Sequence, residues 1–381
     1  MKKKLKKSRG RGKNSGEFLY KEIYEIIRKD ILSGKHKPGN RIPSADELAD
    51  TYSVNRLTVR KAVSGLIAEG LIYTKPAQGT YVVDEVDGVL ERRNAEHANG
   101  RTLNVGIVSR MLVTDNIGFY HSDMIAGIHK GLIENKSNMT ILPFTGKETE
   151  TKLFDHVRKS NLDAAIYIGP FETSALRTMI SKGVPSVLLD FCMKNSGTDC
   201  IVIDNASGGY KAMEHLVQLG HRDIAVVMGA TDQPASSERL SGAMKAAAEC
   251  GIPEKSIKVV RGNFMEISGY ESVAEMIRSG NVPTAIFFMN DEMASGGIRA
   301  LKELSKLSIP QDVSIVGFDN SAWSLMTSPQ LTTISAPVMQ MGKFAVHRLF
   351  AKIRNGGDYS PSSTQMETTL IIRKSTGKSR R

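Results

Sequence analysis

The 381-residue sequence predicts an α/β protein: a small N-terminal domain of three helices and a hairpin, then a two-lobed body with parallel sheets. Residues 17–83 contain three helical segments, separated by capping and turn residues, and then two short β-prone stretches. Residues 84–101 are polar and lack apolar periodicity, which is typical of a linker. Across residues 102–377, continuous Val- and Ile-rich runs alternate with helical segments, as in parallel sheets that are covered on both faces. A stretch of this length favours two lobes over one.

Composition limits the class of protein. No run of eighteen apolar residues occurs, so the sequence predicts no membrane-spanning helix. The basic start resembles the first part of a signal peptide, but the charged stretch FLYKEIYEIIRKD follows where an apolar part would lie. We therefore expect a cytoplasmic protein rather than a secreted one. The three cysteines, Cys192, Cys200 and Cys250, match no metal-binding spacing and are expected to be reduced thiols.

The net charge of +11 lies almost entirely in the N-terminal part of the chain. Residues 1–13 carry eight Lys or Arg and no acid, and residues 14–83 carry ten Lys or Arg against eight acids. A disordered arm at 1–16 could serve only for solubility. Beside a DNA-binding domain, the same arm is expected to bind phosphates and add salt-sensitive affinity.

Capping residues mark the helices of the N-terminal domain. The first helix, expected at 18–32, has a single apolar stripe. Ser44 opens the second helix and forms a capping box with Glu47. Asn55 is expected to cap the third helix, which Gly70 ends. Two β-prone stretches joined by the turn KPAQG then predict a hairpin.

The start of the third helix carries Arg56 and Arg60, although a helix N-terminus has a partial positive charge. A large anion would offset this mismatch, and a helix start already binds anions through its free N–H groups. Three helices and a hairpin, with a tight turn before the third helix, form a winged helix-turn-helix. In this motif the N-terminal residues of the third helix contact base edges in the major groove of DNA. We therefore expect Arg56, Thr58, Arg60 and Lys61 to contact DNA. The alternative is a small helical domain with a solvated basic face.

The stretch GNRIPSADELADTYSVNRLTVRKAVSGLIAEGLIYTKPAQGTYV resembles the DNA-binding domain of the GntR family over roughly residues 17–83. In that family the arginine before the Pro-Ser cap, the start of the recognition helix and the wing tip contact DNA. The resemblance implies DNA contacts at Arg41, Ser44, Asn55, Arg56, Thr58, Arg60, Gln78 and Gly79. Asn55 departs from the family, where Ser or Thr is commoner, so the base preference there stays open.

Polar and aromatic residues follow the strands expected in the body, where parallel sheets bind their ligands. Arg239 begins a helix, Phe264 follows SIKVV, Asn290 and Asp291 follow TAIFFM, and Asp319 follows VSIVGF. A carboxylate, an amide and an arginine can hold vicinal hydroxyls, and an aromatic ring can cover the apolar face of a sugar. Each residue alone is more typical of turn chemistry, and Asp291 of a helix N-cap; it is their collective placement that favours a site.

Residues 102–377 resemble the effector domain of the LacI/GalR family and the related periplasmic sugar-binding proteins. The resemblance is carried by VIDNASGGYKAMEHLVQLGHRDIAVV, SSERLSGAMKAA, PTAIFFMNDEMASGGIRAL, IPQDVSIVGFDNSAW and LTTISAP. It implies a periplasmic-binding-protein-like fold of two lobes with three crossovers, a sugar or purine in the cleft, and a homodimer. It also implies effector contacts at Tyr120, His121, Glu172, Arg239, Phe264, Asn290 and Asp319. Ala336 stands where the family often has a glutamine, which leaves the ligand's identity open.

Together these features predict a transcriptional repressor that binds a pseudo-palindromic operator in double-stranded DNA as a homodimer and is released by a small sugar. A GntR-type domain on a LacI-type body resembles the AraR-type arabinose repressors, so L-arabinose or another pentose is the first ligand expected. The alternative is a regulator that answers to a purine, a sugar phosphate or a partner protein. The sequence shows no phosphate-binding loop, dinucleotide fingerprint or metal-ligand cluster. We therefore expect that the protein is not an enzyme and that it binds no cofactor or metal.

Overall fold

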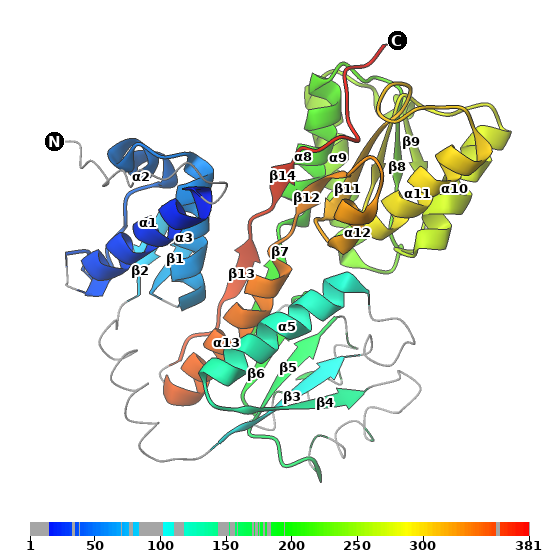
Figure 1. Ribbon diagram of the computed structural model, residues 1–381. Coiled ribbons are helices and arrows are strands. Elements are labelled where there is room, and N and C mark those ends of the chain that lie inside the picture. The colour runs from blue at the N-terminus through cyan, green and yellow to red at the C-terminus, as the bar shows by residue number, and fades with distance from the viewer. Residues whose placement is uncertain are drawn as a thin grey trace.

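The computed structural model describes the N-terminal domain, two lobes and the strands that join them (Figure 1). The described residues are 15–32, 35–37, 39–69, 71–75, 79–83, 102–109, 118–143, 152, 157, 159–169, 171, 174, 176–177, 180, 184–193, 195–355 and 359–380. None of the helices in this described part is long and apolar enough to cross a membrane. Residues 1–14 of the predicted arm at 1–16 and the predicted linker at 84–101 lie outside it, and residues 15 and 16 belong to the first helix.

The N-terminal domain has the predicted winged helix-turn-helix order. Its elements are α1 (Ser15–Leu32), α2 (Ala45–Tyr52), α3 (Arg56–Glu69), β1 (Ile72–Lys75) and β2 (Gly79–Val82). Buried residues from all three helices, such as Ile27, Leu48 and Val59, form one small core. The predicted capping box is confirmed, since Ser44 and Glu47 each bond the other's backbone N–H. The predicted cap of α3 is confirmed too, because Asn55 Oδ1 accepts a hydrogen bond from the Leu57 N–H at 2.9 Å.

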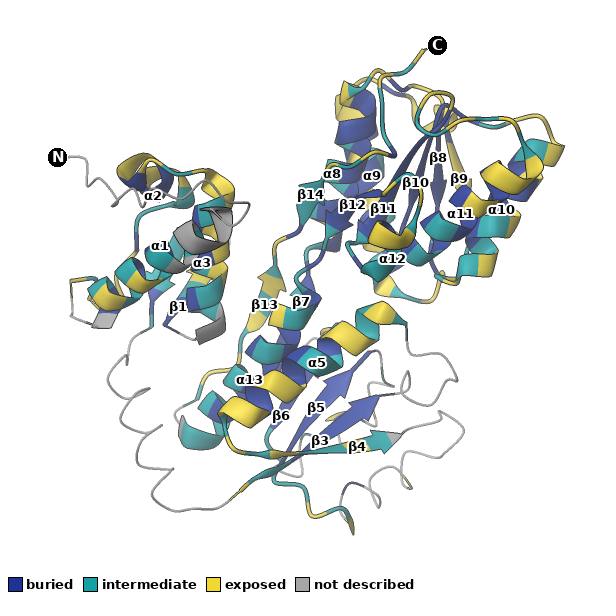
Figure 2. Ribbon diagram, viewed as in Figure 1, coloured by how far each residue is buried: buried dark blue, intermediate teal, exposed yellow. Residues whose placement is uncertain are grey.

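The N-terminal lobe is built on a sheet in which every pair of strands is parallel, in the order β13-β7-β6-β5-β3-β4. Its elements are β3 (Asn104–Ser109), α5 (Phe119–Glu134), β4 (Asn138–Pro143), β5 (Ala164–Ile168), β6 (Ser186–Leu189), β7 (Asp199–Ile203), α13 (Val338–Asn355) and β13 (Ser363–Met366). Strands β5 and β6 are buried throughout (Figure 2), which explains their continuous apolar sequence.

The C-terminal lobe has a sheet in the order β14-β12-β11-β10-β8-β9, in which only the β12–β14 pair is antiparallel among the described strands. Its helices are α8 (Asn205–Gln218), α9 (Pro234–Glu249), η2 (Glu254–Ser256), α10 (Glu266–Arg278), α11 (Asp291–Leu304) and α12 (Ala322–Met326). Its strands are β8 (Ile224–Val227), β9 (Ile257–Val260), β10 (Ala285–Phe288), β11 (Ser314–Asp319), β12 (Thr332–Ser335) and β14 (Thr369–Ile371). Figure 1 shows α8 and α9 on one face of this sheet and α10 and α11 on the other.

The chain passes between the lobes three times, as the family resemblance implied. The passages run from β7 to α8, from β12 to α13 and from β13 to β14. Four of the strands involved, β7, β12, β13 and β14, were not predicted as strands. They are short, and most carry Ser or Thr rather than a continuous apolar run, so they lack the sequence pattern of a buried strand.

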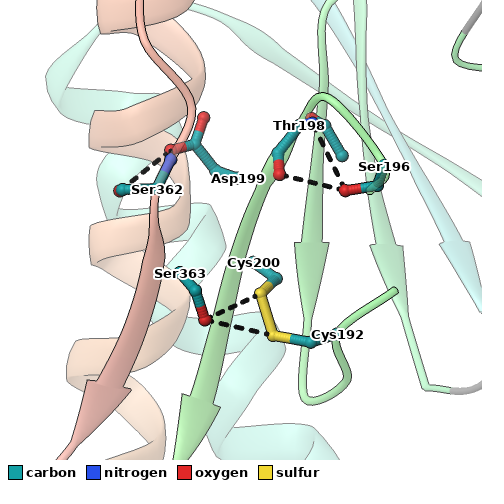
Figure 3. The surroundings of a disulfide bond; sticks show 7 residues. All are labelled: Cys192, Ser196, Thr198, Asp199, Cys200, Ser362 and Ser363. Carbon is teal, nitrogen blue, oxygen red and sulfur yellow. Dashed lines mark hydrogen bonds between the residues drawn. A yellow bond between two sulfur atoms is a disulfide. The ribbon is translucent and has the colours of Figure 1, made fainter. Parts of the chain in front are cut away.

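The prediction of three reduced cysteines is wrong for two of them. Cys192 and Cys200 form a disulfide with their Cα atoms 5.3 Å apart, whereas Cys250 is free and exposed (Figure 3). The pairing arises because β7 returns beside β6, which brings Cys200 back to the segment that follows β6. The hydroxyl of Ser363 on β13 lies 3.2 Å from Cys200 Sγ and 3.6 Å from Cys192 Sγ. Sequence spacing alone does not show this neighbourhood.

Candidate DNA-binding surface and effector cleft

The start of α3 presents a basic surface. Arg56, Arg60 and Lys61 are exposed, and Thr58 is half-buried. Arg56 forms an ion pair with Asp46 on α2, and the ammonium of Lys61 lies 4.2 Å from the ring centre of Tyr20. Neighbouring groups therefore hold the side chains of Arg56 and Lys61. The negative charge of Asp46 partly offsets the repulsion between Arg56 and the positive end of α3.

Arg41 and Gly79 form the edge of the wing. The backbone of Arg41 forms an isolated antiparallel β-bridge with the backbone of Tyr81 on β2. Gly79 has a φ of +116°, and a Cβ there would lie 2.6 Å from Arg41 Nε, so only glycine fits without displacing the arginine. The hydroxyl oxygen of Ser44 accepts a hydrogen bond from Glu47 N at 3.2 Å, which holds this side chain at the start of α2. Gln78 lies outside the described residues.

The second candidate site lies where strands of both lobes end. Four non-glycine residues there have a positive φ: Asp190 after β6, Phe264 after β9, Asp319 at the end of β11, and Asn320 next to it. Positive φ is costly for residues with a side chain and gathers at functional sites. The backbone geometry thus marks the same edge of the sheets as the polar residues do.

Arg239 is the central cation of this cleft. It is 4% exposed and lies with its guanidinium carbon 3.6 Å from the ring centre of Phe318. Its Nε donates to Asn205 Oδ1 at 2.9 Å, and its Nη1 donates to the carbonyl of Met289. These contacts fix the plane of the guanidinium at one edge of the cleft.

Asp319 faces this guanidinium with an unused acceptor. Its Oδ1 lies 3.5 Å from Arg239 Nη1 and makes no hydrogen bond to any described residue, although the side chain is only 9% exposed. Burial raises the pKa of Asp319 well above its usual value, and Arg239 opposes that shift. A buried acceptor that receives no hydrogen bond is costly, so a ligand hydroxyl that donates to Asp319 Oδ1 would be bound strongly.

Tyr120 and Asp190 are the facing groups of the N-terminal lobe. The Tyr120 hydroxyl donates to Asp190 Oδ1 at 2.8 Å. Burial raises the pKa of Asp190 to about 6, while Tyr120 and Arg239 lower it. Burial raises the pKa of Tyr120 well above its usual value, and the charges of Asp190 and of Asp319 in the other lobe raise it further. Sequence analysis missed Asp190, although it follows the apolar run VPSVLL as Asp319 follows its own strand.

Other predicted residues have different surroundings. Asn290 caps α11 through Met293 N and donates to the carbonyl of Phe264 at 2.8 Å, so its amide shapes the cleft wall. The alternative of Asp291 as the N-cap is wrong: Asp291 is buried and accepts from Ser321 N and from Thr333 Oγ1.

His121 and Glu172 are the last two predicted effector contacts. His121 is half-buried beside Tyr120, and burial lowers its pKa, which favours a neutral ring near pH 7. Glu172 lies outside the described residues.

Known proteins with similar sequences are gene regulators. Residues 19–82 match the bacterial regulatory proteins of the gntR family, and residues 213–376 match the periplasmic binding protein-like domain. The transcriptional repressor PurR of Vibrio atlanticus is 31% identical over 268 residues, which cover 69% of this chain and 79% of that protein. The transcriptional regulator DegA of Bacillus subtilis is 31% identical over 231 residues, covering 60% of this chain and 68% of DegA.

A solved structure shows a similar fold. A LacI family transcriptional regulator from Enterococcus faecium with bound ribose superposes with a TM-score of 0.65 at 26% identity, covering 73% of this chain and all of that chain.

Proposed function

Because this chain belongs to the LacI family of transcription regulators and carries a gntR-type domain, we propose that it is a DNA-binding repressor whose operator is released by a small sugar. In this proposal, residues 17–83 bind DNA and residues 102–377 bind the effector and form the homodimer. Residues 84–101 connect them, and the arm at 1–16 adds phosphate contacts.

The DNA-binding domain supports specific recognition through α3. Arg56 and Arg60 are exposed on its first two turns, where a recognition helix meets the bases. Asn55 and Thr58, on the same turn, contact DNA beside these two arginines. The phosphates are contacted by Lys61, Ser44, Arg41 and the wing tip at Gln78 and Gly79. Arg56 exchanges Asp46 for a base edge or a phosphate when DNA binds.

The observation that carries the effector proposal is Asp319 Oδ1, which is ion-paired with the guanidinium of Arg239 but accepts no hydrogen bond from any described residue. Two adjacent hydroxyls of a sugar can donate to Asp319 and accept from Arg239, and Phe264 can cover the apolar face of the ring. Tyr120 and Asp190 meet the ligand from the other lobe, with His121 and Asn290 at the walls and Glu172 as a further contact. The relative with bound ribose supports a pentose, and L-arabinose is the first to test.

A thermal-shift screen with pentoses, hexoses, purines and sugar phosphates tests this function. At a concentration of one hundred times Kd, the true effector stabilises the protein by about 2.7 kcal/mol. Asp319→Asn keeps the size of the side chain and tolerates a positive φ, and it should lower sugar affinity about ten- to hundredfold because a charge-assisted hydrogen bond is lost. The control is Asp223→Asn, an exposed carboxylate before β8. A stabilising sugar that binds Asp319→Asn as tightly as the parent protein would refute the cleft assignment.

A further inference from the structure

The two lobes touch beside the cleft through a pair of aromatic rings. Phe119 is the first residue of α5 in the N-terminal lobe, and Trp323 lies on α12 in the C-terminal lobe. Their ring centres are 5.7 Å apart with planes at 74°, which is a favourable edge-to-face arrangement. Figure 1 shows the start of α5 below α12. Phe119 precedes Tyr120, so this contact borders the polar groups of the cleft directly.

A carboxylate reinforces the contact from the same side. Glu292, in the first turn of α11, has an oxygen 3.5 Å from the position of a Cβ on Gly118. Gly118 is the N-cap of α5, and that helix has no side-chain cap of its own. Burial raises the pKa of Glu292, and the neighbouring Trp323 lowers it. A negative charge from one lobe thus faces the positive end of a helix in the other lobe and lies near the indole.

We propose that Phe119, Trp323 and Glu292 form an interlobe latch that holds the cleft closed over the effector and thereby sets its affinity. This inference rests on the proposed function, because the effector occupies the cleft beside the latch. Phe119 and Trp323 act as positioning residues: they touch each other and stabilise the closed arrangement of the two lobes. A ligand that extends between the two rings would separate them, so the latch also favours a ligand small enough to be enclosed.

The size of the effect follows from population shift. An edge-to-face pair and a carboxylate at a helix N-terminus each change an equilibrium between open and closed lobes by about two- to tenfold. Only the closed state brings the groups of both lobes to the ligand, so apparent affinity changes with the fraction of closed protein. Loss of the aromatic pair should therefore weaken sugar binding about two- to tenfold.

Trp323 is the only tryptophan of the chain, so its fluorescence reports on the latch without a label. In ligand-free protein, Phe119→Ala should increase acrylamide quenching of Trp323, and Phe119→Tyr should restore the parent value because an aromatic ring returns. Ile133→Ala, an exposed change near the other end of α5, is the matched control. Glu292→Gln keeps an acceptor for the indole and removes the charge, so it should weaken closure without abolishing the ring contact.

The same variants are then titrated with L-arabinose, or with the sugar that gives the largest thermal shift. Phe119→Ala should bind it about two- to tenfold more weakly, and Phe119→Tyr should bind it like the parent protein. Quenching and sugar affinity that both stay unchanged in Phe119→Ala would overturn the latch while leaving the proposed function intact. The quenching comparison needs no ligand, so it decides on the latch even if every sugar in the screen fails.

Discussion

Arg239 and the carboxylates around it show how single residues define the cleft. Asp190 and Asp319 lie on different lobes, and each is close enough to Arg239 for its charge to lower their pKa values. Burial acts in the opposite direction and is the larger cause for both. Ligand hydroxyls that donate to these oxygens favour the ionised carboxylates, so sugar binding should release protons and weaken as the pH falls through about 6.

The raised pKa of Asp190 predicts a pH dependence of stability in the ligand-free protein. A carboxyl whose pKa is about 6 when folded binds more protons in the folded state than in the unfolded state. Its contribution to stability is therefore full below its unfolded pKa of about 4 and is lost as the pH rises through about 6. We therefore expect the difference in melting temperature, parent protein minus Asp190→Asn, to increase as the pH is lowered from 7.5 to 4.5. Calorimetry in buffers of matched ionisation heat measures both melting temperatures.

Asp223→Asn provides the control for this comparison. Asp223 is an exposed carboxylate that precedes β8, whereas Asp190 is a buried carboxylate that follows β6. A difference between the parent and Asp190→Asn that stays constant over this pH range would show that Asp190 is not buried as described.

At the residue scale, the sequence predicts which polar residues follow strands. It does not predict which of their polar atoms form hydrogen bonds with other residues. Phe264 and Asp319 were predicted from their positions after apolar runs, and Arg239 as the start of a helix, although α9 in fact begins at Pro234. The structure brings the three residues together in one lobe. Asn290 was predicted to bind the effector, and the structure instead commits its amide to α11 and to Phe264. Which polar atom remains unpaired depends on the full set of neighbours, and the sequence does not contain that information.

At the scale of elements, the N-terminal domain was predictable because its signals are local. Capping residues, apolar stripes and the hairpin turn each act within a few residues along the chain. The crossing strands were not predictable in this way, because partners distant in sequence define them: Ser363 of β13 pairs with Cys200 of β7. The Cys192–Cys200 disulfide was missed for the same reason.

The two arginines at the start of the recognition helix are expected to determine base preference. Arg56→Ala and Arg60→Ala should each cost about 1–3 kcal/mol in binding to a specific site and relax base preference, because each loses a contact to base edges. The sites are obtained by selection from random duplexes, and affinity is measured by gel shift. Arg278→Ala on α10 removes an equally exposed arginine from the body and should leave DNA affinity unchanged. Unchanged base preference in both α3 variants would remove α3 from the DNA interface.

At the scale of the whole molecule, α13 connects the cleft with the DNA-binding domain. It starts at Val338, directly after the passage from β12, and it contacts both α5 and α3. Its packing on α5 is close: a Cβ on Gly127 would lie 2.0 Å from the Met339 carbonyl oxygen, so the two helices move together. Ile67 of α3 packs against the core of the body. Lobe closure can therefore reach the recognition helix through one continuous element.

Fluorescence anisotropy with a selected duplex tests the central claim most directly, because it measures sugar sensing and DNA binding in one titration. Selected duplexes should contain two inverted half-sites, as a two-fold symmetric dimer requires. For the parent protein, the stabilising sugar should raise the Kd for DNA about five- to hundredfold. For Asp319→Asn, DNA binding without sugar should be unchanged, and release should need about ten- to hundredfold more sugar. If the sugar occupies the cleft of the parent protein and the Kd for DNA stays the same, this protein is not a repressor relieved by that sugar.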